Sequence, residues 1–298
     1  MKRGALLAIV VLAACTASSV DPLATAPPTA QSPTETARRP ATTGAPSTDP
    51  IALFDAHVHY SADARQRFTI DEVLAILSEA GVRRALVSST PDDGTIALYE
   101  RAPEIVIPIL RPYRGPGEIG TWTRDGTVVA YLNSRYRPGV HRGIGEFHLA
   151  PGEADLPVVR QVVAMAVRED LVLHAHADAR AVDELLRIDA RARVLWAHAG
   201  LGESAATVGA LVDRYPRLLV ELALRSDVAP AGGLDPEWRA LFLRHPDRFM
   251  YGTDTWVPER WNALVDSAES ARIWLRELPE DVARAIAYGN AERAFATP

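Results

Sequence analysis

After Pro50 the sequence alternates between short apolar runs and longer amphipathic stretches, which is the pattern of βα units. We expect eight strands, at Ala52–His57, Arg84–Ser88, Ile105–Leu110, Gly143–Phe147, Leu171–His174, Val194–Ala197, Leu218–Leu222 and Phe249–Gly252. Eight strands with helices between them in about 250 residues predict a (β/α)₈ (TIM) barrel of the α/β class. The alternative is a doubly wound open sheet, which more often has a Gly-rich turn after its first strand, and none is present here.

Helix signals lie between the predicted strands. Thr69 and Glu72 form a capping box before an apolar stripe, and Gly81 supplies the stop signal that follows it. Further helices are predicted at Leu156–Arg168, Ala179–Ile188 and Ala205–Tyr215, and two extra C-terminal helices at Trp261–Arg276 and Asp281–Ala287. The barrel domain should therefore occupy residues 51–298.

The first fifty residues have a different character. Lys2 and Arg3 precede an apolar run, Ala5–Ala14, which is too short to cross a membrane and is typical of an export signal. The run ends in Leu-Ala-Ala-Cys15, which resembles the lipobox of bacterial lipoproteins. That resemblance implies cleavage after residue 14, acylation of Cys15 and an extracytoplasmic, membrane-anchored protein of the cell envelope. An ordinary cleaved signal with an incidental cysteine is the alternative.

Residues 15–50 would follow as a tether. Thr16–Pro50 is rich in Thr, Pro, Ala and Ser, contains seven prolines and has almost no large apolar side chains. Such a segment cannot bury enough surface to offset its ordering entropy, so we expect a disordered, partly extended spacer.

Two residue counts exclude several chemistries. Lys2 is the only lysine and Cys15 the only cysteine. The barrel therefore has no thiol nucleophile, disulfide, Cys-ligated zinc or Schiff-base lysine. The net charge of −6 gives no basic field for nucleic acid, so a small-molecule substrate is expected.

Most of the histidines lie where predicted strands end. Of the eight in the chain, the six at such ends are His57, His59, His148, His174, His176 and His198. Glu146 shares the end of the fourth strand with His148, and Asp254 lies at the end of the eighth. Side chains two residues apart on a strand face the same side, and all strand ends of a barrel meet at one rim. Without a cation, so many polar groups in one mouth would be costly.

This set resembles the amidohydrolase superfamily of metal-dependent hydrolases. The closing residues Tyr288–Phe295, with Gly-Asn-Ala at 289–291, are similar to the ending common in its amidohydrolase-2 (amidohydrolase-related) branch. The resemblance implies that His57, His59 and Asp254 hold a buried metal, and that His174 and His198 hold a second one if it is present. No lysine is available on strand four to bridge two ions, so either Glu146 bridges them or the site is mononuclear. His174 is preferred to His176 because it directly follows its strand.

Nitrogen and carboxylate ligands suit Zn²⁺, Mn²⁺ or Fe²⁺ and do not by themselves choose among them. We expect one or two divalent ions, with Zn²⁺ first and Mn²⁺ or Fe²⁺ as alternatives. Asp254 is then the natural general base. Candidate substrate contacts are His148, His176, Arg111 and Arg225; Arg114, Glu221, Trp122 and Trp256 are weaker candidates. For the arginines and Glu221, a solvated loop or an ion pair is the alternative.

The predicted function is that of a lipid-anchored hydrolase in which a metal-activated water attacks an amide, ester, lactone or related bond. One alternative is a mononuclear or metal-independent lactonase or decarboxylase-like relative. Another is a non-catalytic binding lipoprotein, and the sequence leaves substrate and oligomeric state open. A glycosidase pair of Glu146 and Glu221 would leave the histidines unexplained.

Overall fold

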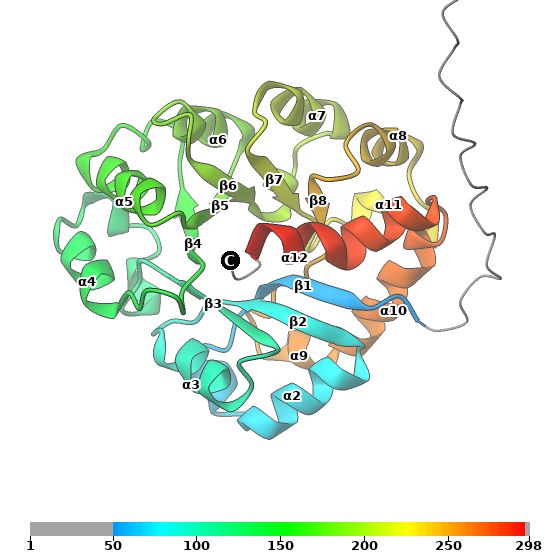
Figure 1. Cartoon of the computed structure of the whole chain (residues 1–298), viewed down its shortest axis with the longest axis horizontal. Coiled ribbons are helices and arrows are strands. Elements are labelled where there is room, and N and C mark those ends of the chain that lie inside the picture. The colour runs from blue at the N-terminus through cyan, green and yellow to red at the C-terminus, as the bar shows by residue number, and fades with distance from the viewer. Residues whose placement is uncertain (1–49, 296–298) are drawn as a thin grey trace, which may run out of the picture. The chain divides into compact units, whose positions relative to one another are not determined.

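The computed structural model describes residues 50–295, so the predicted signal peptide, Cys15 and the spacer to residue 49 lie outside the described residues. Eight parallel strands follow one another around a single sheet in chain order, as predicted (Figure 1). They are β1 (Leu53–Val58), β2 (Val82–Val87), β3 (Val106–Leu110), β4 (Gly143–Leu149), β5 (Val172–Ala177), β6 (Arg193–Trp196), β7 (Leu218–Glu221) and β8 (Phe249–Met250). The fold is a nearly closed (β/α)₈ barrel.

The barrel closes between its first and last strands through a short seam. The amide of Ala56 donates to the carbonyl of Tyr251 (2.9 Å), and the amide of Asp254 donates to the carbonyl of His57 (2.7 Å). The buried carboxylate of Asp55 accepts from the amide (3.0 Å) and the hydroxyl (2.6 Å) of Thr253. Because β8 is only two residues long, the Asp55 side chain supplies hydrogen bonds across the seam where a longer strand would pair through its backbone.

Helices surround the sheet between and after the strands. They are α1 (Ala62–Arg65), α2 (Ile70–Glu79), α3 (Asp93–Arg101), α4 (Thr127–Arg135), α5 (Pro157–Arg168), α6 (Ala179–Leu186), α7 (Ala205–Arg214), α8 (Pro236–Arg244), α9 (Glu259–Asn262), α10 (Leu264–Leu275), α11 (Glu280–Arg284) and α12 (Asn290–Phe295). The capping box is confirmed: Thr69 Oγ1 accepts from the Glu72 amide, and Glu72 accepts from the Thr69 amide (2.7 Å). None of the described helices is long and apolar enough to span a bilayer.

The predicted C-terminal helices are confirmed with altered bounds. The stretch predicted as one helix from Trp261 to Arg276 is divided at Ala263 into α9 and α10. The stretch predicted from Asp281 starts one residue earlier as α11 and passes into a π-helical turn over Ala285–Gly289 before α12. Helices α1, α3, α4, α8 and α12 were not predicted.

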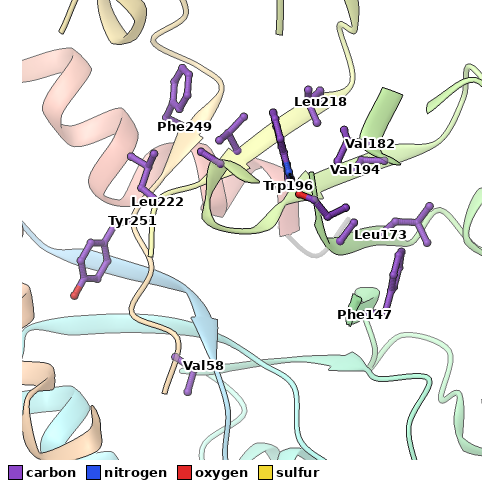
Figure 2. Packing of buried hydrophobic residues seen from close by; sticks show 14 of the residues in the cluster. Val58, Phe147, Leu173, Val182, Val194, Trp196, Leu218, Leu222, Phe249 and Tyr251 are labelled. Carbon is purple, nitrogen blue, oxygen red and sulfur yellow. Dashed lines mark hydrogen bonds between the residues drawn. The ribbon is translucent and has the colours of Figure 1, made fainter. Parts of the chain in front are cut away.

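Two apolar layers position the strand ends. The larger one lies between strands and helices; Figure 2 shows part of it, including Trp196, Leu218 and Phe249. The smaller one fills the amino-terminal end of the barrel, where Ala291 and Phe295 of α12 cover Phe54. Asn290 fastens α12 there, since its Nδ2 donates to the carbonyls of Pro246 (2.9 Å) and Phe249 (2.7 Å). Figure 1 shows α12 across the centre of the barrel, so the opposite, carboxyl-terminal rim is left for a site.

Candidate metal centre

Four side-chain atoms converge at the carboxyl-terminal rim of the barrel. The separations are 3.1 Å for His57 Nε2 to His59 Nε2, 3.3 Å for His59 Nε2 to Glu146 Oε2, 3.3 Å for His59 Nε2 to Asp254 Oδ1, 3.5 Å for His57 Nε2 to Glu146 Oε2 and 3.8 Å for His57 Nε2 to Asp254 Oδ1. Ligands about 2.1 Å from a tetrahedral zinc ion would lie about 3.4 Å from one another. The observed separations therefore fit a common divalent cation.

Three histidine rings are held so that their Nε2 atoms face this centre. The Nδ1 atoms contact acceptors behind them: Glu221 Oε2 for His57 (2.8 Å), the Ser88 carbonyl for His59 (2.8 Å) and the Ala223 carbonyl for His198 (3.1 Å). An acceptor at Nδ1 keeps the proton on that atom and leaves the Nε2 lone pair available to a metal. The rings are therefore oriented as ligands.

Glu221 is the residue whose role the sequence reasoning missed. It does not pair with Arg225 in the described contacts. Its Oε2 instead accepts from His57 Nδ1 and from the His198 amide (3.1 Å), and its Oε1 from the Ala223 amide. Its signal in the sequence is its position, as a carboxylate ending the apolar run of β7.

The second oxygen of Glu146 faces another pair of rings. Glu146 Oε1 lies 2.8 Å from His176 Nδ1 and 3.5 Å from His198 Nε2, while Oε2 faces His57 and His59. Glu146 thus lies between two groups of ligand atoms, as a bridging carboxylate would. His57, His59 and Glu146 form one compact group, and Glu146, His176 and His198 form another.

His174 and His176 have different surroundings on β5. The His174 ring is buried against the His57 ring, with centroids 4.5 Å apart, and neither of its nitrogens has a hydrogen-bond partner. Burial, together with the neighbouring His57, holds the pKa of His174 well below its usual range, so the ring is neutral. His176 is partly exposed, bonded to Glu146 and stacked on His148 (4.2 Å). A bound cation would give a partner to a His174 nitrogen that otherwise has none.

The charges around His57 favour a cation. Burial alone would lower its pKa, but Glu146, Glu221 and Asp254 together hold the pKa well above the ordinary value. For Glu146 the opposing effects are reversed: burial would raise the pKa, while His57, His176 and His198 keep it well below the usual range. A proton on His57 therefore occupies a position that a metal ion would fill, and the two should compete.

Asp254, four residues after the end of β8, takes a left-handed backbone conformation (φ 54°). Burial would raise its pKa, but the facing His57 and His59 rings hold the pKa well below the usual range. Its Oδ2 accepts from Arg260 Nη1 (2.7 Å), a contact that was not predicted because Arg260 lies in the short helix α9 of the following loop. The carboxylate is thus ionised and fixed.

Arg225, predicted as a substrate contact, is occupied by the protein. Its guanidinium donates to the carbonyls of His198 (3.3 Å), Ala199 (2.7 Å) and Glu203 (2.6 Å), and pairs with Asp227 (2.7 Å). His198 and Ala199 have positive φ values of 56° and 44°. Since such backbone is strained for non-glycine residues, Arg225 supports the turn that carries His198.

Arg111 lies beside the centre. It donates through Nε to the carbonyl (2.9 Å) and through Nη2 to Oε2 (3.3 Å) of Glu146, and its guanidinium lies between the rings of Tyr113 and Trp256. Its buried Nη1 has no hydrogen-bond partner. Trp256 also meets the His59 ring edge-on, so it borders the centre. Arg114, by contrast, pairs with Glu118 and Asp125 on the surface, and Trp122 is buried, donating to the His148 carbonyl (2.7 Å).

A hollow of about 400 Å³ opens beside this centre. His148 and His176 form part of its wall, with apolar side chains that include Ile119, Leu149 and Leu201. Burial lowers the pKa of His148 to about 4, so its ring is neutral at physiological pH. The size of the hollow suits a small molecule.

The comparisons with known proteins agree with this geometry. A family model for amidohydrolases matches residues 54–297. The chain belongs to the amidohydrolase family. Members of this family are hydrolases, and the His, Asp and Glu cluster described above is a candidate metal site of the kind they use. No curated protein matches the chain.

Solved structures share the fold at low sequence identity. A Burkholderia multivorans amidohydrolase with bound zinc is 18% identical, with a TM-score of 0.54 over 83% of this chain and 100% of its own. A TatD homologue from Escherichia coli is 18% identical, with a TM-score of 0.56 over 83% of this chain and 98% of its own. An amidohydrolase 2 from Bifidobacterium longum is 16% identical, with a TM-score of 0.54 over 83% of this chain and 100% of its own.

Proposed function

We propose that this chain is an exported, lipid-anchored hydrolase that uses a divalent metal to cleave an amide, ester or lactone bond of a small molecule. The convergence of His57, His59, Glu146 and Asp254 is the observation that supports it most directly, since the two imidazole Nε2 atoms lie 3.1 Å apart and 3.3–3.8 Å from both carboxylates. The anchor is proposed from Cys15, and the tether from the Pro- and Thr-rich segment that follows it.

The residues would hold the metal as follows. His57, His59, Asp254 and Glu146 Oε2 would bind the first ion. These nitrogen and oxygen donors suit Zn²⁺, Mn²⁺ or Fe²⁺, and zinc is the first candidate because the similar Burkholderia multivorans amidohydrolase has zinc bound. His198 and one of the two β5 histidines, His174 or His176, would hold a second ion, with Glu146 as the bridge. A divalent cation bound there would acidify a water and polarise the carbonyl oxygen of the substrate.

Asp254 is proposed as the general base. Its pKa is held well below the usual range, so it is ionised and able to accept a proton at neutral pH. Arg260 donates to Oδ2 and so orients the carboxylate toward the centre. Asp254 would accept a proton from the attacking water and pass it to the leaving group. Arg111 Nη1, buried and without a partner, is placed to donate to a substrate oxygen beside Glu146.

Metal content and activity can be tested on the purified full chain without a chelating tag. We expect about one or two equivalents of metal, loss of activity on chelation, and recovery with Zn²⁺ or Mn²⁺ in a screen of amides, esters, lactones and phosphoesters. Asp254→Asn should lower kcat by about 10²–10⁴-fold while retaining much of the metal. Asp266→Asn, on α10, is the matched control. Hydrolysis that survives chelation would contradict metal dependence, and a metal-free, inactive chain would favour a binding protein.

A further inference from the structure

A second hollow, of about 530 Å³, lies at the amino-terminal end of the barrel, opposite the metal centre. Its charged wall residues are Arg193, Arg217, Arg248, Arg293, Asp170 and Asp247. They come from the residues just before or at the start of β5 to β8 and from α12, so the end of the barrel rather than one loop builds the hollow. None of these residues takes part in the proposed reaction.

The hollow carries excess positive charge. Asp170 pairs with Arg193 (3.2 Å), and Asp247 pairs with Arg248 (3.3 Å). Arg217 is exposed, and its side chain makes no hydrogen bond or ion pair within the described part of the chain, while Arg293 bonds only the uncharged Asn290 side chain. Two guanidinium groups are thus without a carboxylate partner, in a chain whose net charge is −6.

The chemistry of these groups selects the ligand. Guanidinium is planar, always charged and presents paired donors that match the oxygens of a phosphate group. Several such groups around one hollow, with few competing carboxylates, favour a phosphate-type anion over a neutral ligand.

The position of the hollow indicates the source of that phosphate. Ile51 and Leu53 begin the barrel at this same end, where Leu53 donates to the Gly81 carbonyl (3.1 Å) and Arg272 donates to the Ile51 carbonyl (3.0 Å). A tether that enters here would bring this end toward the bilayer and leave the metal centre facing away from it. We propose that the arginine hollow binds the phosphate of anionic phospholipid headgroups; the choice of a lipid source rests on the proposed anchorage, not on the hydrolase activity.

Vesicle co-sedimentation of the full chain tests this, with Cys15→Ser in every sample so that no acyl chain contributes. Vesicles of phosphatidylcholine alone are compared with vesicles that also contain phosphatidylglycerol. We expect tighter binding to the anionic vesicles, reduced about fivefold by Arg217→Gln and about 25-fold by Arg217→Gln with Arg293→Gln, since each arginine near an anionic surface contributes about that factor. Arg239→Gln, at an exposed arginine of α8 that makes no ion pair in the described contacts, should change nothing.

If the Arg217→Gln, Arg293→Gln double variant fails to fold, the vesicle binding of Arg217→Gln alone still tests the proposal. Equal binding to neutral and anionic vesicles would overturn the proposal, as would equal losses for Arg217→Gln and Arg239→Gln. Calorimetry with inorganic phosphate at the same ionic strength forms the second arm: tighter binding of free phosphate than of anionic vesicles would overturn the assignment to phospholipid. Metal content and hydrolysis are measured in parallel and should not differ between the variants.

Discussion

Arg260 and Asp254 are joined twice, since Arg260 Nη1 lies 2.7 Å from Asp254 Oδ2 and 2.8 Å from the Asp254 carbonyl oxygen. One guanidinium therefore fixes both the carboxylate and the left-handed backbone that presents it. Arg260 contacts Oδ2, whereas Oδ1 faces the His57 and His59 rings. Arg260 is therefore a positioning residue for the proposed base.

Replacing Arg260 should thus affect turnover more than metal binding. We expect Arg260→Gln to lower kcat about 10–100-fold, because a misplaced base loses alignment with the reacting atoms. KM and metal content should change little. Steady-state kinetics with metal analysis checks this against Arg276→Gln, an exposed arginine that follows α10. A loss of metal equal to the loss of kcat would show that Arg260 supports the metal ligands instead.

Glu221 should control metal affinity. Glu221→Gln replaces an acceptor with an amide that cannot accept from all three N–H groups around it, so the His57 ring loses its orientation. We expect metal affinity to fall about 10–100-fold, measured by competition with a chromophoric chelator. Glu237→Gln on α8 is the exposed control, and unchanged affinity in Glu221→Gln would contradict the role assigned to Glu221.

The two β5 histidines can be separated by thermal unfolding. His174→Leu removes two buried nitrogens without partners, so the metal-free protein should melt no lower than the parent chain. Added Zn²⁺ should then raise Tm less in His174→Leu than in the parent chain or in His176→Leu. If His176→Leu loses the Zn²⁺-dependent rise and His174→Leu keeps it, His176 is the ligand.

Asp55 should make the metal-free protein less stable as pH rises. Burial raises the pKa of Asp55 from 3.8 to about 7, against the bonds from Thr253 and His57 that lower it. The folded state therefore holds a proton that the unfolded state releases above about pH 4, so the stability that this proton supports falls as pH rises from about 4 to 7.

Asp55→Asn mimics the protonated carboxyl and should remove this pH dependence. Urea unfolding in the presence of a chelator, at several pH values, measures it; a chelator is needed because a nearby cation would itself change the pKa of Asp55. Asp63→Asn, at an exposed position on α1, is the control. If the stability of the parent chain, taken relative to that of Asp55→Asn, does not fall over this pH range, the prediction is wrong.

Asn290 should contribute to stability through α12. Asn290→Ala removes two buried hydrogen bonds to the carbonyls of Pro246 and Phe249, at a cost of about 2–3 kcal/mol. Differential scanning calorimetry should show a lower Tm with metal binding retained, since α12 lies at the opposite end from the metal centre. Asn262→Ala on α9 is the control. A Tm equal to that of the parent chain would mean that apolar packing alone holds α12.

The strands and the convergence of the histidines at one rim were predictable for one physical reason. Strands that are buried on both faces appear in the sequence as continuous apolar runs. Because the strands are parallel, the side chains at their carboxyl ends all lie at the same rim of the barrel. Helices α3 and α8 were missed because their first residues, Asp-Asp-Gly at 92–94 and Gly-Gly before α8, also fit turns. In α4, a weak amphipathic pattern follows another glycine, Gly126.

The supporting residues of the centre were not predictable in the same way. Glu221 contacts a ring 164 positions earlier in the chain, and Arg260 reaches Asp254 from a helix of only four residues. Their roles depend on which segments come into contact at the carboxyl-terminal rim of the barrel. No local sequence pattern predicts those contacts. Arg225 shows the converse, because its charge suggested a substrate contact while its bonds serve the backbone around His198.

Because the seam between β1 and β8 is short, a metal bound at the centre would also help to hold the barrel closed. His57 and His59 stand on one side of the joint and Asp254 on the other, so a single ion coordinated by all three would cross-link the first and last strands of the barrel. Metal binding and closure of the barrel would then be coupled. Hydrogen exchange at the Ala56 amide, which bonds across the seam, would report on both.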